Sequence, residues 1–223
     1  NAVAAIMGEG YLPCAIEFLD HRCIKLIGDM LPFSLAHPKP SVLIIEVDGP
    51  RRQVDEDMQA IIGITRKQSA IETLMAHTEE EREKIWSVRR AVSLRIHDYA
   101  RIYIPEDIVV PITAIAELVD ALPAYEEKYA FEVFAFGHAG DGNIHLNITT
   151  QDLGQENLAW QGTQALLELA LRLQGTISGE HGIGLAKRDY ISMELPAASI
   201  DFQKRIKALF DPNQVLNPGK IFP

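Results

Sequence analysis

The alternation of apolar and polar positions divides the chain into short strands and longer helices. The run "SVLIIEVDG" at residues 41–49 is apolar and β-branched and ends in Asp-Gly, which predicts a buried strand. The clearest helix is predicted at residues 77–100. Its apolar side chains recur at helical spacing, at Ile85, Val88, Val92 and Ile96. Thr78 is expected to cap this helix, because three glutamates follow in the first turn, where the helix dipole favours acidic groups.

The other elements follow from the same patterns. Further helices are predicted at residues 50–68, 112–129, 155–175 and 199–210. Further strands are predicted at residues 101–111, 130–138 and 143–150. Pro105 is expected to interrupt the first of these strands, and residues 31–40 to form a loop. A tight hairpin excludes a purely parallel sheet, so we predict an α+β fold: an antiparallel or mixed, ferredoxin-like sheet with helices packed on one face.

The hairpin joins the last two predicted strands and places two histidines symmetrically. Asp141 and Gly142 lie between apolar runs, a pattern that favours a two-residue type I′ turn. With that turn, His138 pairs directly with His145 on one face of the sheet, with Cβ atoms about 5 Å apart. Asn147 follows two residues later and shares the face. A longer turn would keep the symmetry and change the pairing.

Two neighbouring imidazoles suit a shared metal ion, and a second segment offers a third ligand. Glu180 and His181 lie between glycines in "SGEHGIG". Two histidines and Glu180 would leave coordination positions open, as in sites for Zn, Mn, Fe or Co. His181 would then be free to act as a base near neutral pH. The alternatives are a pair of hydrogen-bonded histidines near a sheet edge and a solvated loop before a helix.

Composition narrows the possible functions. The net charge of -10 excludes general nucleic-acid binding, which needs a basic face. No apolar run approaches the roughly 20 residues of a membrane span, and the first residues do not resemble a secretory signal. Cys14 and Cys23 form no disulfide framework, which indicates reduced thiols and a cytoplasmic protein. Peripheral attachment at the inner face of the membrane is the alternative location.

Three motifs follow one another along the chain: "GHAGDGNIHLN", "GTISGEHGIGLAKRDYI" and "LFDPNQVLNPGKIFP". Together they resemble the C-terminal domain of the FAD-linked oxidases, the group of the glycolate oxidase D subunit, D-lactate dehydrogenase and D-2-hydroxyglutarate dehydrogenase. The earlier segments "LPCAIEFLD" and "LIIEVDG" fit as well. The resemblance covers nearly the whole chain. We therefore expect residues 1–223 to form the substrate- and metal-binding cap domain of such an enzyme.

The resemblance implies a role for each matching position. A divalent metal would be held by His138, His145 and Glu180. Asn147 would contact the substrate, and His181 would be the catalytic base. Arg89, in "IWSVRRAV", would bind the substrate carboxylate through its planar guanidinium, with Ser93 one turn later assisting. Arg90 takes this place if the register slips by one residue, and Arg89 is then an exposed partner of the acidic first turn.

The resemblance also implies parts that this sequence lacks. The FAD-binding domain of the family lies N-terminal to this region, and no GxGxxG motif follows a first strand here. Asn1 is not a methionine, so we expect a piece of a longer protein. The "NPGKIFP" tail would run toward the FAD domain, with Asn217 contacting the cofactor, although a plain extended terminus explains its composition equally well.

The implied reaction is oxidation of a small 2-hydroxy acid to a keto acid, with hydride transfer to FAD and electrons passing on to a partner such as an iron–sulfur subunit. Relatives that take dicarboxylates place a lysine where Ile104 or Pro105 stands, which favours glycolate or D-lactate here. Two alternatives belong to other classes. One is a metal-stabilised carboxylate-binding module without turnover, and the other is a stand-alone metal hydrolase.

Overall fold

The protein is described here by a computed structural model that covers residues 1–31 and 40–223. The loop predicted at residues 31–40 therefore lies almost entirely outside the described residues. Five strands form one sheet in the order β2-β1-β4-β5-β3, and every neighbouring pair is antiparallel. The strands are β1 (Ala15–Leu19), β2 (Val42–Glu46), β3 (Ile102–Val109), β4 (Glu132–His138) and β5 (Asn143–Thr150). The predicted α+β class with an antiparallel sheet is confirmed.

The helices are α1 (Ala2–Gly8), α2 (His21–Leu26), α3 (Arg51–Lys67), α4 (Glu79–Tyr99), α5 (Ile115–Tyr129), α6 (Glu156–Arg172), α7 (Ile191–Glu194) and α8 (Ala197–Phe210). The prediction did not include α1, β1 or α2. Thr78 caps α4 as expected, because its hydroxyl accepts a bond from the Glu81 backbone while the Glu81 carboxylate accepts one from the Thr78 backbone. None of the helices in the described residues combines the length and apolar character needed to cross a membrane.

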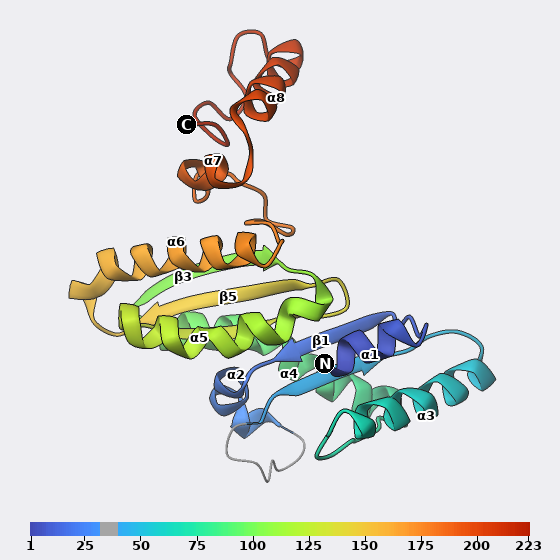
Figure 1. Ribbon diagram of the computed structural model, residues 1–223. Helices are drawn as coiled ribbons and strands as arrows, with labels where there is room; N and C mark the ends of the chain where they lie inside the picture. Colours follow the sequence, from blue (N-terminus) through green and yellow to red (C-terminus); the bar gives the residue numbers. More distant parts are fainter. Residues whose placement is uncertain (32–39) are drawn as a thin grey trace.

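Helices cover both faces of the sheet, and the prediction of a single covered face was wrong (Figure 1). Along β4, Val133 and Ala135 belong to the larger core with α5 and α6, whereas Phe134 and Phe136 belong to a second core with α2 and α4. Both faces of β4 are therefore apolar. Each face needs a helical layer, because an uncovered apolar face would stay in contact with water.

The strand β3 runs through Pro105 without interruption, contrary to the prediction. Pro105 lies opposite Asn147 in the register with β5. Because β3 is the outer strand of the sheet, a residue without an N–H group leaves the ladder intact there. The same register puts Pro105 on the face that α4 covers and Ile104 on the opposite face, where Ile104 is buried in the larger core.

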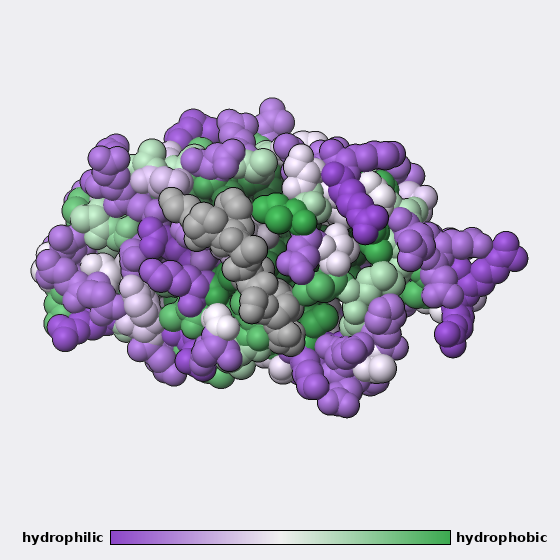
Figure 2. All heavy atoms as spheres, turned by 90° about the horizontal axis from the view of Figure 1, so that it is seen from below, coloured by the Kyte–Doolittle hydropathy of each residue, from purple (hydrophilic) through white to green (hydrophobic). Residues whose placement is uncertain are grey.

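The last part of the chain, from α8 onward, departs from this layered body. Figure 1 shows α8 and the C terminus projecting away from the sheet. Ile200 is the buried residue of α8, whereas Phe202, Leu209 and Phe210 are exposed. Apolar residues also gather near the middle of the face seen from below, with hydrophilic residues around them (Figure 2). The tail bonds back to the segment after α6: the Ile221 backbone N–H donates to the Gly184 carbonyl at 2.8 Å, and Arg188 Nη1 donates to the Gly219 carbonyl at 3.1 Å.

Candidate metal and substrate site

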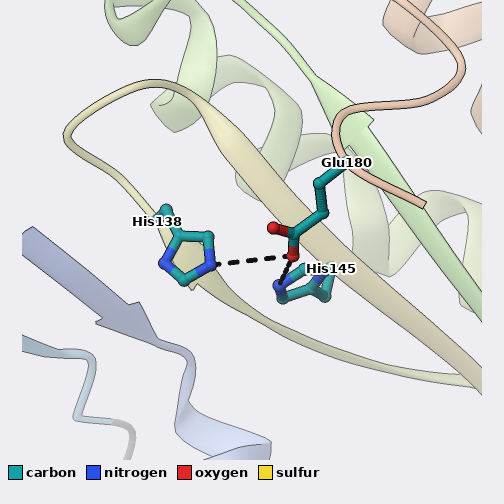
Figure 3. Close-up of side chains that lie close together, drawn as sticks. All are labelled: His138, His145 and Glu180. Atoms are coloured by element: carbon teal, nitrogen blue, oxygen red, sulfur yellow. Dashed lines mark ion pairs between the residues drawn. The ribbon is translucent and has the colours of Figure 1, made fainter. Parts of the chain in front are cut away.

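Three side chains from distant parts of the chain point toward one another (Figure 3). His138 ends β4, His145 lies on β5, and Glu180 belongs to the glycine-rich loop after α6. The Glu180 Oε1 atom is 3.8 Å from His138 Nε2 and 3.6 Å from His145 Nε2. These separations exceed hydrogen-bond length, and they approach the ~3.4 Å between two ligands that each bind a tetrahedral ion at ~2.1 Å. The donor set and its spacing therefore fit one divalent metal ion.

The two histidines are diagonal neighbours on the sheet, and the predicted direct pairing was wrong. His138 pairs with Asn143, and His145 pairs with Phe136, because the turn spans residues 139–142 instead of two residues. Gly142 has φ +85° and packs closely against the Val110 carbonyl. The Gly142 carbonyl also accepts a hydrogen bond from the Val110 backbone N–H, and the two contacts fix the longer turn. Both histidines still share one face, with ring centroids 5.5 Å apart.

A buried carboxylate that the sequence analysis missed connects this cluster to Arg89. Glu17 on β1 is 4% exposed. Its Oε1 atom accepts a bond from His138 Nδ1 at 2.5 Å, and its Oε2 atom accepts one from Arg89 Nε at 2.7 Å. The Arg89 guanidinium also lies over the Phe136 ring, 4.6 Å from its centroid. The signal in the sequence was one acidic residue within the apolar run "AIEFL".

The electrostatic environment keeps His145 in its neutral form. Burial, followed by the nearby His138 and Arg89, lowers the pKa of His145 from 6.5 to about 4. The imidazole is therefore neutral at pH 7, and a neutral imidazole is the form that coordinates metals.

The loop that carries Glu180 and His181 is anchored on β3 by Asp107, a second residue that the sequence analysis missed. The fully buried Asp107 carboxylate accepts backbone N–H bonds from Gly179, Glu180 and His181 at 2.9, 2.6 and 2.9 Å. Burial would raise the pKa of Asp107, but bonds from Lys187 and from these N–H groups lower it overall. The loop is glycine-rich because Gly182 and Gly184, with φ of +75° and +54°, adopt a backbone conformation that other residues rarely take.

His181 lies beside the cluster instead of within it. Its ring stacks on His145 with centroids 5.6 Å apart, and its Nδ1 atom is 3.5 Å from the Asp107 carboxylate. The side chains of Glu180 and His181 are about half exposed, at 51% and 53%. The site is therefore open to solvent on the side of this loop, where a substrate can enter.

The other predicted residues differ in their distance from the cluster. Asn147 is buried on the same face, where its amide accepts a bond from Tyr103 and donates one to the Phe134 carbonyl. Ser93 lies one turn beyond Arg89 and is exposed. Arg90 pairs with Glu83 on the exposed side of α4, which leaves Arg89 as the arginine of the site. Asn217 is exposed in the tail, bonded to Lys220, and is not brought to the cluster.

Solved structures share this fold. The chain matches a 4-ethylphenol oxidase from Gulosibacter chungangensis over 99% of its own length and 50% of that chain, with a TM-score of 0.68 and 14% identity. It matches an alkyldihydroxyacetonephosphate synthase over 98% of its length and 42% of that chain, with a TM-score of 0.61 and 16% identity. At sequence identities this low, the structural similarity establishes a common fold and nothing further.

The sequence itself matches the model of the FAD-linked oxidase C-terminal domain over residues 1–221, and the chain belongs to this family. It is 37% identical to glycolate oxidase subunit GlcD of Bacillus subtilis (strain 168), over 100% of this chain and 48% of the relative. It is 32% identical to mitochondrial D-2-hydroxyglutarate dehydrogenase of Danio rerio, over 96% of this chain and 40% of the relative. It is 30% identical to D-lactate dehydrogenase of Anaerostipes hadrus, over 94% of this chain and 46% of the relative. The chain spans about half the length of these relatives.

Proposed function

We propose that residues 1–223 form the substrate- and metal-binding domain of a flavin-dependent 2-hydroxy acid dehydrogenase. The observation that carries this proposal is the convergence of a His/His/Glu cluster, an arginine and a further histidine on one side of the sheet, which is open to solvent at the Glu180 loop. Such a set can bind a carboxylate, hold a metal and move a proton. The names of the relatives, which include glycolate oxidase and D-lactate dehydrogenase, supply the substrate class.

In this proposal each residue of the site has a separate role. Arg89 binds the substrate carboxylate, and Asn147 and Ser93 complete the contacts to the substrate. His181 takes the hydroxyl proton, since its ring faces the cluster from the open side. A divalent ion held by His138, His145 and Glu180 would lower the pKa of the hydroxyl. FAD would supply the hydride acceptor.

The FAD would be bound mainly by another domain of the same polypeptide. The exposed apolar side chains of α8 and the tail support this proposal, because they need a partner surface. They include Phe202, Ile206, Leu209, Phe210, Val215 and Leu216. We propose that this domain covers them and that Asn217 contacts the cofactor there. We also propose an iron–sulfur electron acceptor on a separate subunit, since the glycolate oxidase relatives are named as subunits. A cytoplasmic location fits the two free cysteines, Cys14 and Cys23.

Metal binding is the first test. The purified 223-residue chain should bind about one equivalent of Zn²⁺ or Mn²⁺ at pH 7.5, and His145→Ala should lower the bound metal to less than about a tenth, because one of three ligands is lost. Metal content measured by atomic emission after dialysis checks this. His77→Ala removes an exposed histidine from outside the cluster and serves as the control. Full metal content in His145→Ala would rule out the ligand set.

The substrate is tested with the complete enzyme and an artificial electron acceptor. Glycolate or D-lactate should be oxidised roughly 10–100-fold more efficiently than 2-hydroxyglutarate, because Pro105 offers no cation to a second carboxylate. Pro105→Lys should narrow this ratio, whereas Ile104→Val, in the core of the other face, should leave it unchanged. Tight metal binding without oxidation of any 2-hydroxy acid would favour a carboxylate-binding module without turnover.

A further inference from the structure

Glu17 lies between the proposed metal ligand His138 and the proposed carboxylate-binding residue Arg89. It is the buried carboxylate of β1, in register with His138 of β4. Both of its oxygen atoms accept bonds from groups with assigned tasks: Oε1 from the metal ligand His138 and Oε2 from the carboxylate-binding Arg89. Residues 17 and 138 are separated by 121 positions in the chain, so this link exists only in the folded sheet.

Position 17 needs a side chain with two hydrogen-bond acceptors, because both of its partners are donors. Arg89 Nε is always a donor, and His138 Nδ1 must donate because it faces a carboxylate oxygen at 2.5 Å. The proton on Nδ1 leaves the lone pair on Nε2, the atom that faces Glu180 and His145. A glutamine offers one acceptor and one NH₂ group, so it can satisfy only one of the two donors.

The geometry also leaves Arg89 free to bind a ligand. Within the described residues, the hydrogen bond from Arg89 is the one from Nε to Glu17. The Arg89 guanidinium also packs over the Phe136 ring, 4.6 Å from its centroid. The two terminal nitrogens then point a fork of donors away from Glu17, which suits bidentate recognition of a carboxylate.

We propose that Glu17 is the positioning residue of this site: it sets the tautomer of His138 for metal binding and fixes the guanidinium of Arg89 beside the metal. The inference rests on the proposed function, because it assigns Glu17 a task toward the same metal and the same substrate carboxylate. Outer partners of metal-bound histidines act in this way when they fix ring orientation and tautomer.

The test compares Zn²⁺ affinity of the 223-residue chain and its variants by competition with a fluorescent chelator. Glu17→Gln should weaken Zn²⁺ binding about 10–100-fold. Glu46→Gln is the matched control, because Glu46 also joins the sheet to α4, through Arg82 and Trp86, without touching a metal ligand. Its affinity should stay within about threefold of the wild type. An equal loss in both variants, or no loss in Glu17→Gln, would overturn the proposal.

A second measurement separates positioning from general destabilisation. Nitrogen-15 NMR of the metal-free chain should show His138 protonated on Nδ1 in the wild type and in Glu46→Gln, but a mixture of tautomers in Glu17→Gln. With the complete enzyme at saturating Zn²⁺, Glu17→Gln should raise the KM for the 2-hydroxy acid at least about tenfold, because Arg89 loses its anchor. An unchanged tautomer or an unchanged KM would contradict the corresponding half of the proposal.

Zn²⁺ binding by the His145→Ala variant shows whether a negative result concerns Glu17 alone or the whole metal site. If the wild type binds Zn²⁺ and His145→Ala does not, then normal binding by Glu17→Gln overturns the role of Glu17 alone. If the wild type binds no Zn²⁺, or His145→Ala binds as tightly as the wild type, the metal site and the role of Glu17 toward it are overturned together.

Discussion

His181→Ala in the complete enzyme should lower turnover about 10²–10⁴-fold while the metal stays bound, because a positioned general base contributes an effect of this size. The structure places the His181 ring against His145 and beside Asp107, outside the set of three ligand atoms. Loss of the ring therefore removes a proton acceptor and leaves the metal ligands intact. Steady-state kinetics with an artificial electron acceptor measures the turnover, and atomic emission measures the metal.

The control for this experiment is His97→Ala, since His97 is an exposed histidine on α4 outside the cluster. It should retain nearly full turnover. Unchanged turnover in His181→Ala would reject its role as the base. Loss of metal in His181→Ala would instead make His181 a fourth ligand, and the division between ligands and base would be wrong.

Lys187→Met should destabilise the chain by about 3–5 kcal/mol, the typical cost of removing one partner from a buried ion pair. Lys187 is 3% exposed and reaches the Asp107 carboxylate, the Asp107 carbonyl at 2.9 Å, the Ile177 carbonyl at 2.6 Å and the Glu106 carboxylate at 3.2 Å. Burial already raises the pKa of Glu106, with Lys187 opposing this rise. Without Lys187, two buried carboxylates lie side by side with no cation.

Urea denaturation at pH 7 measures this loss, and Lys84→Met, which removes an exposed lysine paired with Glu80, is the control. The pH dependence has a definite sign. The wild type keeps the pKa of Asp107 below its unfolded value, so this stabilisation is present above pH 3.8 and is lost as the pH falls. In Lys187→Met the carboxylates gain stability from protonation. The gap between the two proteins should therefore narrow from pH 7 toward pH 4, and a constant gap would contradict the ion-pair explanation.

Local signals in the sequence were sufficient for much of the fold. The period of α4 and its Thr78 cap depend on neighbours within a few residues, so both could be predicted and both are confirmed. The grouping of His138 and His145 on one face followed from strand alternation, and it holds because the observed four-residue turn, like the predicted two-residue turn, has an even number of residues. The pairing itself was mispredicted, because Gly142 packs on Val110, the residue directly after β3.

The residues that support the site could not be read from local pattern. Glu17, Asp107 and Lys187 acquire these partners through sheet pairing and loop docking across 72 to 121 positions of the chain. A single acidic residue in an apolar strand indicates burial but does not identify its partner. The second helical layer was missed for a related reason. Phe134 and Phe136 on β4 show that this face is apolar, but they do not identify the helices that pack on it.

The position of β1 in the sheet has a consequence for how the chain folds. This strand comes from the first 19 residues, yet it is inserted between β2 and β4 and closes the sheet across more than 100 positions. Contacts of such long separation form slowly, because the entropy of a long loop is lost before the contact is gained. His138 therefore meets Glu17 only after the first and middle parts of the chain have come together. We therefore expect the link from the histidines to Glu17 and Arg89 to form after the β4–β5 hairpin that carries both histidines.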